Sequence, residues 1–135
     1  MKRTIGLLFA LAVSADAAGA SAGTGIADDQ EINHGLFVIA VADKIRTDCD
    51  GIDARLWTAY RFIEKLKSTA RARGYTRAEV EAYLDDTQAK MRMNTLRNAY
   101  FAEHGAGDLV PERLCVLGRD EIARKSEIGH LLQAK

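Results

Sequence analysis

The chain has 135 residues, and its 19 lysines and arginines balance its 19 aspartates and glutamates, so the formal net charge is zero. Nucleic-acid binders need a positive surface that neutralises phosphates, and this balance excludes that class. Hydrophobic residues make up 47% of the chain, which is enough for a packed core and excludes a disordered chain. The length fits one small domain.

The N-terminus has the three parts of a secretory signal peptide. Lys2 and Arg3 form a basic start, an apolar run covers residues 5–13 (IGLLFALAV), and small residues dominate 14–23. The apolar run is too short for a membrane span, which needs about 20 residues. We therefore expect residues 1–22 to be a cleaved signal peptide, with the cut after Ala20 or Ala22. The mature protein would then be periplasmic or secreted, without a membrane span.

We expect residues 23–31 to form a flexible N-terminal segment and residues 32–135 to form a single helical domain. Cys49 and Cys115 are the only cysteines. In the oxidising compartment of an exported protein they favour a disulfide over reactive thiols. The bridge would close a loop of about 67 residues and contribute roughly 4 kcal/mol in the chain-entropy model.

The first predicted helix covers residues 32–46, and its centre at 36–42 (LFVIAVA) is apolar on every side. The spacing of the apolar residues alone does not distinguish a buried helix from a strand here. We favour a helix because no second strand-like run exists for this segment to pair with. The all-round apolarity places it at the centre of the core.

The second predicted helix covers residues 53–73, and Gly74 follows as a left-handed stop. Its apolar residues fall within an arc of about 160°, so we expect one stripe that faces the core. The stripe consists of Leu56, Ala59, Tyr60, Phe62, Ile63, Leu66 and Ala70.

Capping signals mark the start of the next two helices. Thr76 and Glu79 fit a capping box, with Tyr75 and Val80 placed to close a hydrophobic staple, so a helix begins at Thr76 and ends near Leu84. Residues 85–87 supply caps for a fourth helix that runs to about residue 104, before Gly105. Its narrow apolar stripe consists of Ala89, Met93, Leu96 and Tyr100.

The last long helix has Pro111 in its first turn. We expect Asp120 to pair with Arg124, and Glu121 with Lys125, on its exposed side. The opposite face carries Leu114, Cys115, Gly118 and Ile122, and Gly118 leaves room for a neighbouring element. Ser126 is placed to cap a short final turn at 127–132. The sequence thus predicts an all-α fold, a small bundle of about five helices with one disulfide.

Motifs for catalysis or for a cofactor are absent from the sequence. It contains no G-x-S-x-G, S-x-x-K, G-x-G-x-x-G or Walker-type motif. His34, His104 and His130 lack metal-ligand spacing and suit solvated positions or helix ends. The acidic clusters at 28–29, 48–53 and 85–86 are explained by helix caps. We therefore expect no catalytic residue, no cofactor and no metal.

Three large side chains fall off the predicted stripes. Trp57 lies beyond the edge of its stripe, where an aromatic can anchor an interface or can pack on the first helix. Met91 and Phe101 point away from the stripe of the fourth helix and have the same two interpretations. Together with Arg119 they are the candidate interaction surface.

Several motifs resemble a family of small exported alphaproteobacterial proteins, the domain of unknown function 5333. They are Cys49 with residues 50–52 (DGI), residues 74–76 (GYT), residues 90–92 (KMR) and the stretch 114–132. The resemblance implies a signal peptide, a helical fold and a bridge between Cys49 and Cys115. It implies no activity and no catalytic residue.

The function that we expect is that of an exported binding or accessory protein with an unknown partner in the cell envelope. An enzyme of cell-envelope polymers, or an inhibitor, with a site near Arg119, Asp120 and Glu121 is the alternative hypothesis. A periplasmic chaperone of the holdase type is a third.

Overall fold

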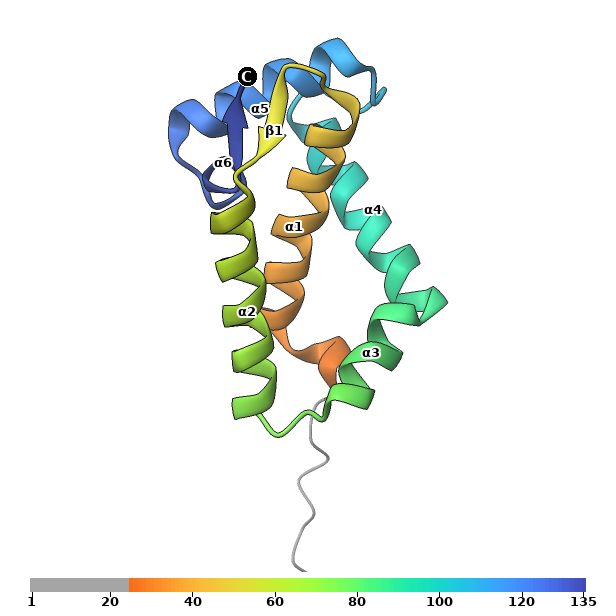
Figure 1. The fold of residues 1–135 in the computed structure, drawn as a ribbon. Coiled ribbons are helices and arrows are strands. Elements are labelled where there is room, and N and C mark those ends of the chain that lie inside the picture. The colour runs from red at the N-terminus through yellow and green to blue at the C-terminus, as the bar shows by residue number, and fades with distance from the viewer. Residues whose placement is uncertain (1–24) are drawn as a thin grey trace, which may run out of the picture.

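The computed structural model describes residues 25–135, which fold into six helices, one short 3₁₀ turn and a two-stranded sheet (Figure 1). The predicted all-α bundle of about five helices with one disulfide is confirmed, and the predicted signal peptide lies outside the described residues. The elements are η1 (Ile26–Asp28), α1 (Gln30–Asp48), β1 (Ile52–Ala54), α2 (Leu56–Ala72), α3 (Arg77–Asp85), α4 (Thr87–Glu103), α5 (Pro111–Arg124), α6 (Glu127–His130) and β2 (Leu132–Ala134). None of these helices is long and apolar enough to cross a membrane.

Helix α1 is the centre of the fold, as its apolar composition predicted. It lies between α2 on one side and α4 on the other, and its C-terminal half packs on α5, α6 and β1 (Figure 1). Val38, Val41 and Ile45 are buried in the main core. The other core residues come mostly from the far end of the chain, and they include Phe101, Ala106, Leu114, Leu117, Ile128, Leu131 and Leu132.

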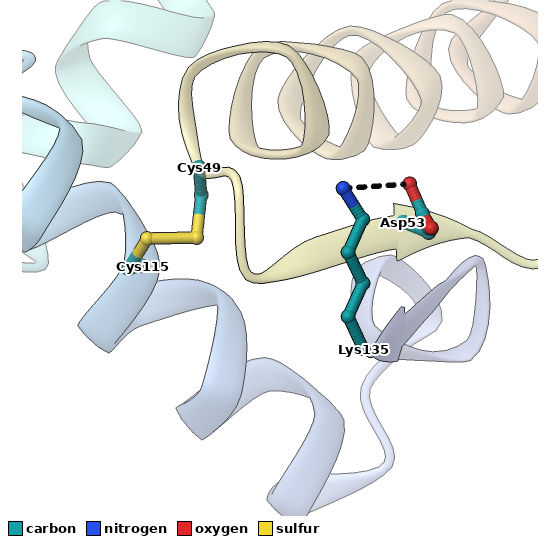
Figure 2. Close-up of a disulfide and its surroundings, with 4 residues drawn as sticks. All are labelled: Cys49, Asp53, Cys115 and Lys135. Atoms are coloured by element: carbon teal, nitrogen blue, oxygen red, sulfur yellow. Dashed lines mark ion pairs between the residues drawn. A yellow bond between two sulfur atoms is a disulfide. The ribbon is translucent and has the colours of Figure 1, made fainter.

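The disulfide joins Cys49 at the end of α1 to Cys115 in the first turns of α5, with 5.2 Å between the two Cα atoms (Figure 2). One turn further along α5, a β-carbon at Gly118 would lie 2.6 Å from Cγ2 of Ile45 and 2.5 Å from Cδ1 of Ile52. A larger residue here would require the side chains of Ile45 and Ile52 to shift. The predicted role of Gly118 in the close approach of this helix is therefore confirmed.

Two short strands were not predicted. Ile52–Ala54 pairs antiparallel with Leu132–Ala134, so the second helix begins at Leu56 rather than at residue 53, and the final turn ends at His130. Ile52 and Leu132 are both buried, and the ladder satisfies the backbone groups beside them. An ion pair between Lys135 and Asp53, with 3.4 Å between Nζ and Oδ1, flanks the pairing (Figure 2).

The expectation of a flexible segment at 23–31 is wrong for residues 26–31. Ile26 is buried in a second small core with Ile32 and Ala70. The carboxylate of Asp29 is also buried, and it caps α1 by accepting a hydrogen bond from the Ile32 amide at 3.1 Å. Arg73 donates to the same carboxylate at 2.5 Å. Helix α1 consequently begins at Gln30, two residues earlier than predicted.

Opposing effects act on the pKa of Asp29. Burial alone raises the pKa of the carboxyl, but the hydrogen bond from the Ile32 amide and the charge and hydrogen bond of Arg73 together outweigh it. The pKa of Asp29 therefore lies below its usual value, and the ionised carboxylate ties the start of α1 to the end of α2.

The predicted capping signals are present. Thr76 and Glu79 form the capping box of α3, and Asp86 caps α4 by accepting from the Ala89 amide at 2.7 Å. Gly74 adopts a left-handed conformation with φ of 86°, which ends α2 as expected. These turns direct α3 and α4 to the side of α1 opposite α2 (Figure 1).

Candidate functional site

The four residues of the predicted interaction surface lie in different surroundings. Trp57 is 70% exposed on α2 and Met91 is 55% exposed on α4, while Arg119 is exposed on α5 with its guanidinium beside Gly51. Phe101 is completely buried in the main core, so its predicted place on the surface is wrong. The C-terminal part of α4 belongs to the main core, and the side of the helix that carries Phe101 faces inward there.

Helix α2 carries an exposed apolar surface that we call the α2 stripe. It consists of Leu56, Trp57, Tyr60 and Ile63, with exposed fractions of 79%, 70%, 54% and 36%. The rings of Trp57 and Tyr60 stack with 5.7 Å between their centroids. Three of these residues were predicted to face the core, and that prediction is wrong for them.

The exposure of the α2 stripe follows from the position of α2. Only one edge of the predicted stripe, which includes Ala59, Phe62, Leu66 and Ala70, packs inward. Helices α3 and α4 lie on the other side of α1, so within residues 25–135 no helix covers the remaining edge (Figure 1). One neighbouring helix covers less than an arc of about 160°. The width of the predicted stripe was therefore the sign in the sequence that part of it would be exposed.

Three hollows of about 280, 450 and 210 Å³ lie along α2, α3 and α4. The first and third share the lining residues Ile39 and Asp43 of α1, and the second and third share Leu84 of α3. Leu56 and Ile63 of the α2 stripe line the first hollow. No motif in the sequence pointed to these hollows, because each is lined by residues of separate helices.

Glu121 is the other feature that sequence reasoning missed. Its side chain is completely buried, so the predicted exposed pair with Lys125 is wrong. The hydroxyls of Tyr100 and Ser126 donate to its carboxylate, and Arg124 donates at 2.8 Å. Ser126 also caps α6, as predicted, by accepting from the Gly129 amide at 3.0 Å. The network joins α4, α5 and α6.

The electrostatics of this network favour a structural role. Burial, and then the Glu121 carboxylate, raise the pKa of Tyr100 to about 12, so the phenol stays protonated and keeps donating. Arg124 also contacts Asp120 at 3.0 Å, which confirms the predicted pair of those two residues. Oε1 of Glu121 accepts from Tyr100 of α4 and from Arg124 of α5 itself, and Oε2 accepts from Ser126 at the start of α6. This arrangement stabilises the contacts among the three helices.

The three histidines lie apart from one another in the structure. His34 contacts Glu127 at 2.5 Å, His104 stacks on Tyr100 with 4.0 Å between ring centroids, and His130 ends α6. Across residues 25–135, no group of three or more His, Cys, Asp or Glu side chains is arranged to hold a metal ion.

Comparison with known proteins gives a family but no characterised relative. A search of the curated proteins found no match, and a search of the solved structures found none. The sequence model of the family of unknown function DUF5333 matches residues 24–133, which include every helix described above. The chain therefore belongs to the DUF5333 family.

Proposed function

We propose that the chain is an exported protein that acts without catalysis, by binding another protein of the cell envelope through the α2 stripe. The observation that carries this proposal is the exposure of Leu56, Trp57 and Tyr60 side by side on one helix. Large aromatic side chains are typical anchors of protein interfaces, and adjacent exposed apolar residues mark such interfaces.

The disulfide supports the exported part of the proposal. Such bridges are typical of secreted and periplasmic proteins and rare in the cytosol. Fractionation of producing cells, followed by intact mass measurement, tests this part. We expect a periplasmic or secreted protein that begins after Ala20 or Ala22 and has no free thiol. A cytoplasmic protein of full length with free thiols would contradict it.

Site-specific photocrosslinking in the native cell tests the binding part. A photoreactive amino acid at position 57 or 60 should give a discrete crosslinked product that contains one partner. The same amino acid at position 116 is the control, because Val116 is an exposed apolar residue outside the α2 stripe. Absence of any product at 57 and 60, or identical products at all three positions, would refute a binding role for the stripe.

A variant with both aromatics removed provides a second test. Trp57→Ala together with Tyr60→Ala should abolish the product formed by a crosslinker at position 56. Both side chains are more than half exposed, so we expect the free energy of unfolding to change by less than about 1 kcal/mol. A lost product without lost stability assigns the effect to binding.

The exposed apolar residues also fit a chaperone of the holdase type. A holdase would crosslink to many unfolded chains and would suppress the aggregation of a denatured reporter protein in proportion to its concentration. A dedicated accessory protein would give one product and no such suppression. The crosslinking experiment therefore distinguishes the two hypotheses.

A further inference from the structure

The α2 stripe borders an uncharged hollow on one side. Eight of the ten residues that line the first hollow, of about 280 Å³, are apolar, and they include Leu56 and Ile63 of the stripe. The two charged lining residues, Asp43 and Arg46, pair with each other at 2.5 Å. A hollow with such walls accepts an apolar side chain and disfavours a charged one, because a charge loses its water there without gaining a partner.

The other side of the α2 stripe carries two basic residues, Arg61 and Lys65, which we call the basic row. They are four residues apart and therefore lie on the same side of the helix. Both are exposed, and within residues 25–135 neither side chain has an ion pair or a hydrogen bond. The neighbouring carboxylates are already engaged in ion pairs, which are Glu64 with Lys67 at 2.8 Å, Glu127 with His34 at 2.5 Å, and Glu31 with Arg73. The basic row is therefore a positive charge that its surroundings leave without a partner.

The hollow, the aromatic pair and the basic row lie next to one another around α2. A helix turns by about 100° per residue, and this rotation fixes the order of the exposed side chains. Ile63 at the hollow comes first, and Tyr60, Trp57, Arg61 and Lys65 follow at steps of about 40–60°. The hollow and the basic row are consequently separated by about the 10–12 Å diameter of a helix, with the stacked rings between them.

We infer that the partner protein presents to this surface an apolar side chain and, about 10–12 Å away, a carboxylate. The apolar side chain would fill the first hollow beside Leu56 and Ile63, and the carboxylate would pair with the basic row. This inference rests on the proposed function, because it states the chemistry of the protein that binds the α2 stripe. Charge pairs at the edge of an interface act mainly on the rate of association and on specificity, so binding should weaken with salt.

An anionic membrane is the other kind of surface that aromatic and basic side chains can bind. A helix that lies on a membrane presents an apolar face along its length. On α2 the large exposed apolar side chains end at Ile63, since Leu66 and Ala70 pack into the second small core and Lys67 and Arg71 are exposed. An apolar surface of only two turns, with charge to one side, fits a pocket on a protein better than a membrane.

A second copy of this chain matches the surface less well. The copy could offer Leu84 of α3, which is 47% exposed and is followed by two carboxylates. Asp85 already pairs with Lys90 at 3.6 Å, and Asp86 accepts from the Ala89 amide as the cap of α4. Neither carboxylate is free to pair with the basic row of another molecule.

Mapping of the crosslinked residues in the native cell tests the inference. A short aliphatic photoreactive residue is placed at position 56, at the edge of the hollow, or at position 68, one turn after Lys65 and exposed. Tandem mass spectrometry of the crosslinked peptides identifies the partner residues. We expect position 56 to reach an apolar residue and position 68 to reach a segment that contains aspartate or glutamate.

Reversal of the basic row tests the charge. Arg61→Glu with Lys65→Glu should lower the yield of the product formed from position 57 by about tenfold, and lysine in place of the mapped partner carboxylate should restore it. Arg92→Glu with Lys125→Glu is the matched control, because both residues are exposed and, within residues 25–135, have no side-chain ion pair. The control should leave the yield unchanged.

A charge at the edge of the hollow tests the apolar contact. Leu56→Glu should abolish the product formed from position 57, and Leu56 is 79% exposed, so the fold should be unaffected by circular dichroism. Val116→Glu is the control, since Val116 is 65% exposed and lies outside the α2 stripe.

Several outcomes would overturn the inference. An unchanged yield after reversal of the basic row, or a loss that the partner's lysine does not restore, would remove the carboxylate. A charged partner residue mapped from position 56 would remove the apolar side chain. Phospholipid adducts in place of a protein product would make the surface a membrane contact, and a product of two copies of this chain would make a second copy the occupant. If position 57 captures one partner while the mapping and the reversal fail, the proposed function stands and this inference alone is refuted.

Discussion

The packing of α6 on α5 makes a quantitative prediction for Gly129. A β-carbon at this position would lie 2.0 Å from the carbonyl oxygen of Glu121 and 2.6 Å from the amide nitrogen of Ile122. Non-bonded heavy atoms essentially never lie closer than 3.0 Å to a β-carbon. Gly129→Ala must therefore move α6 away from α5 by about 1 Å. Both contacts are with the backbone of α5, which has no rotamer change that would relieve them.

The expected cost follows from what moves with α6. Ile128, Leu131 and Leu132 are buried in the main core, and the Ser126 cap of α6 depends on the Gly129 amide. Overpacking of a tight core costs about 1–3 kcal/mol, and loss of a cap costs about 1 kcal/mol. The better helix propensity of alanine offsets about 1 kcal/mol. We expect Gly129→Ala to lower the free energy of unfolding by about 1–3 kcal/mol.

Two other glycine substitutions serve as references. At Gly118 the short contacts are with the side-chain ends of Ile45 and Ile52, which can adjust, so Gly118→Ala should cost less than Gly129→Ala. At Gly25 nothing lies within 4 Å of the added carbon, and we expect a change below about 0.5 kcal/mol. Urea unfolding followed by far-UV circular dichroism, with the disulfide intact, measures all three. A cost for Gly129→Ala no larger than that for Gly118→Ala would refute the close approach of α6 to α5.

Three further predictions concern the bridge and two titrating groups. Replacing Cys49 and Cys115 by alanine should lower the free energy of unfolding by about 4 kcal/mol, because the bridge spans 66 residues. Urea unfolding measures this loss, and a value below about 1 kcal/mol would contradict the prediction. The pKa of Tyr100 is raised to about 12, so the stability that its phenol contributes is present below its unfolded value near 10 and is lost as the pH rises toward 12. Spectrophotometric alkaline titration of the wild type against Tyr100→Phe checks this, and full ionisation by pH 10 would contradict it. The pKa of Asp29 is lowered, so the stability that its carboxylate contributes is present above the unfolded value of 3.8 and is lost as the pH falls through the folded one. In acid unfolding the difference between the wild type and Asp29→Asn should therefore shrink, and a constant difference would count against the Arg73 pair.

The parts of the fold that the sequence predicted correctly are those determined by short-range contacts. The Thr76 capping box, the Ser126 cap and the stop at Gly74 each involve residues within a few positions of one another. The start of α5 at Pro111 is of the same kind, because a proline loses no hydrogen bond in the first turn. Such signals depend little on the rest of the molecule.

The parts that the sequence did not predict depend on contacts between distant segments. Strands of three residues have no periodic pattern, and Ile52 finds its partner Ala134 only in the folded chain. The burial of Glu121 depends on Tyr100 from another helix, and the exposure of the α2 stripe depends on the side of α1 that α3 and α4 occupy. The hollows along α2, α3 and α4 are invisible to sequence reasoning for the same reason, since residues of separate helices line each of them.

The pairing of α1 with the far end of the chain has a consequence for the order of folding. Ile45 packs near Gly118, and β1 has no strand to pair with before β2 has been made. The central helix therefore lacks its main partners until the segment 111–134 has been synthesised. Contacts between segments so far apart in sequence form slowly, because a long loop must close before they gain any stability. Until then the apolar side chains in the centre of α1 lack most of the core that buries them. The bridge joins these same two regions of the chain, so oxidation favours the arrangement in which this core is assembled.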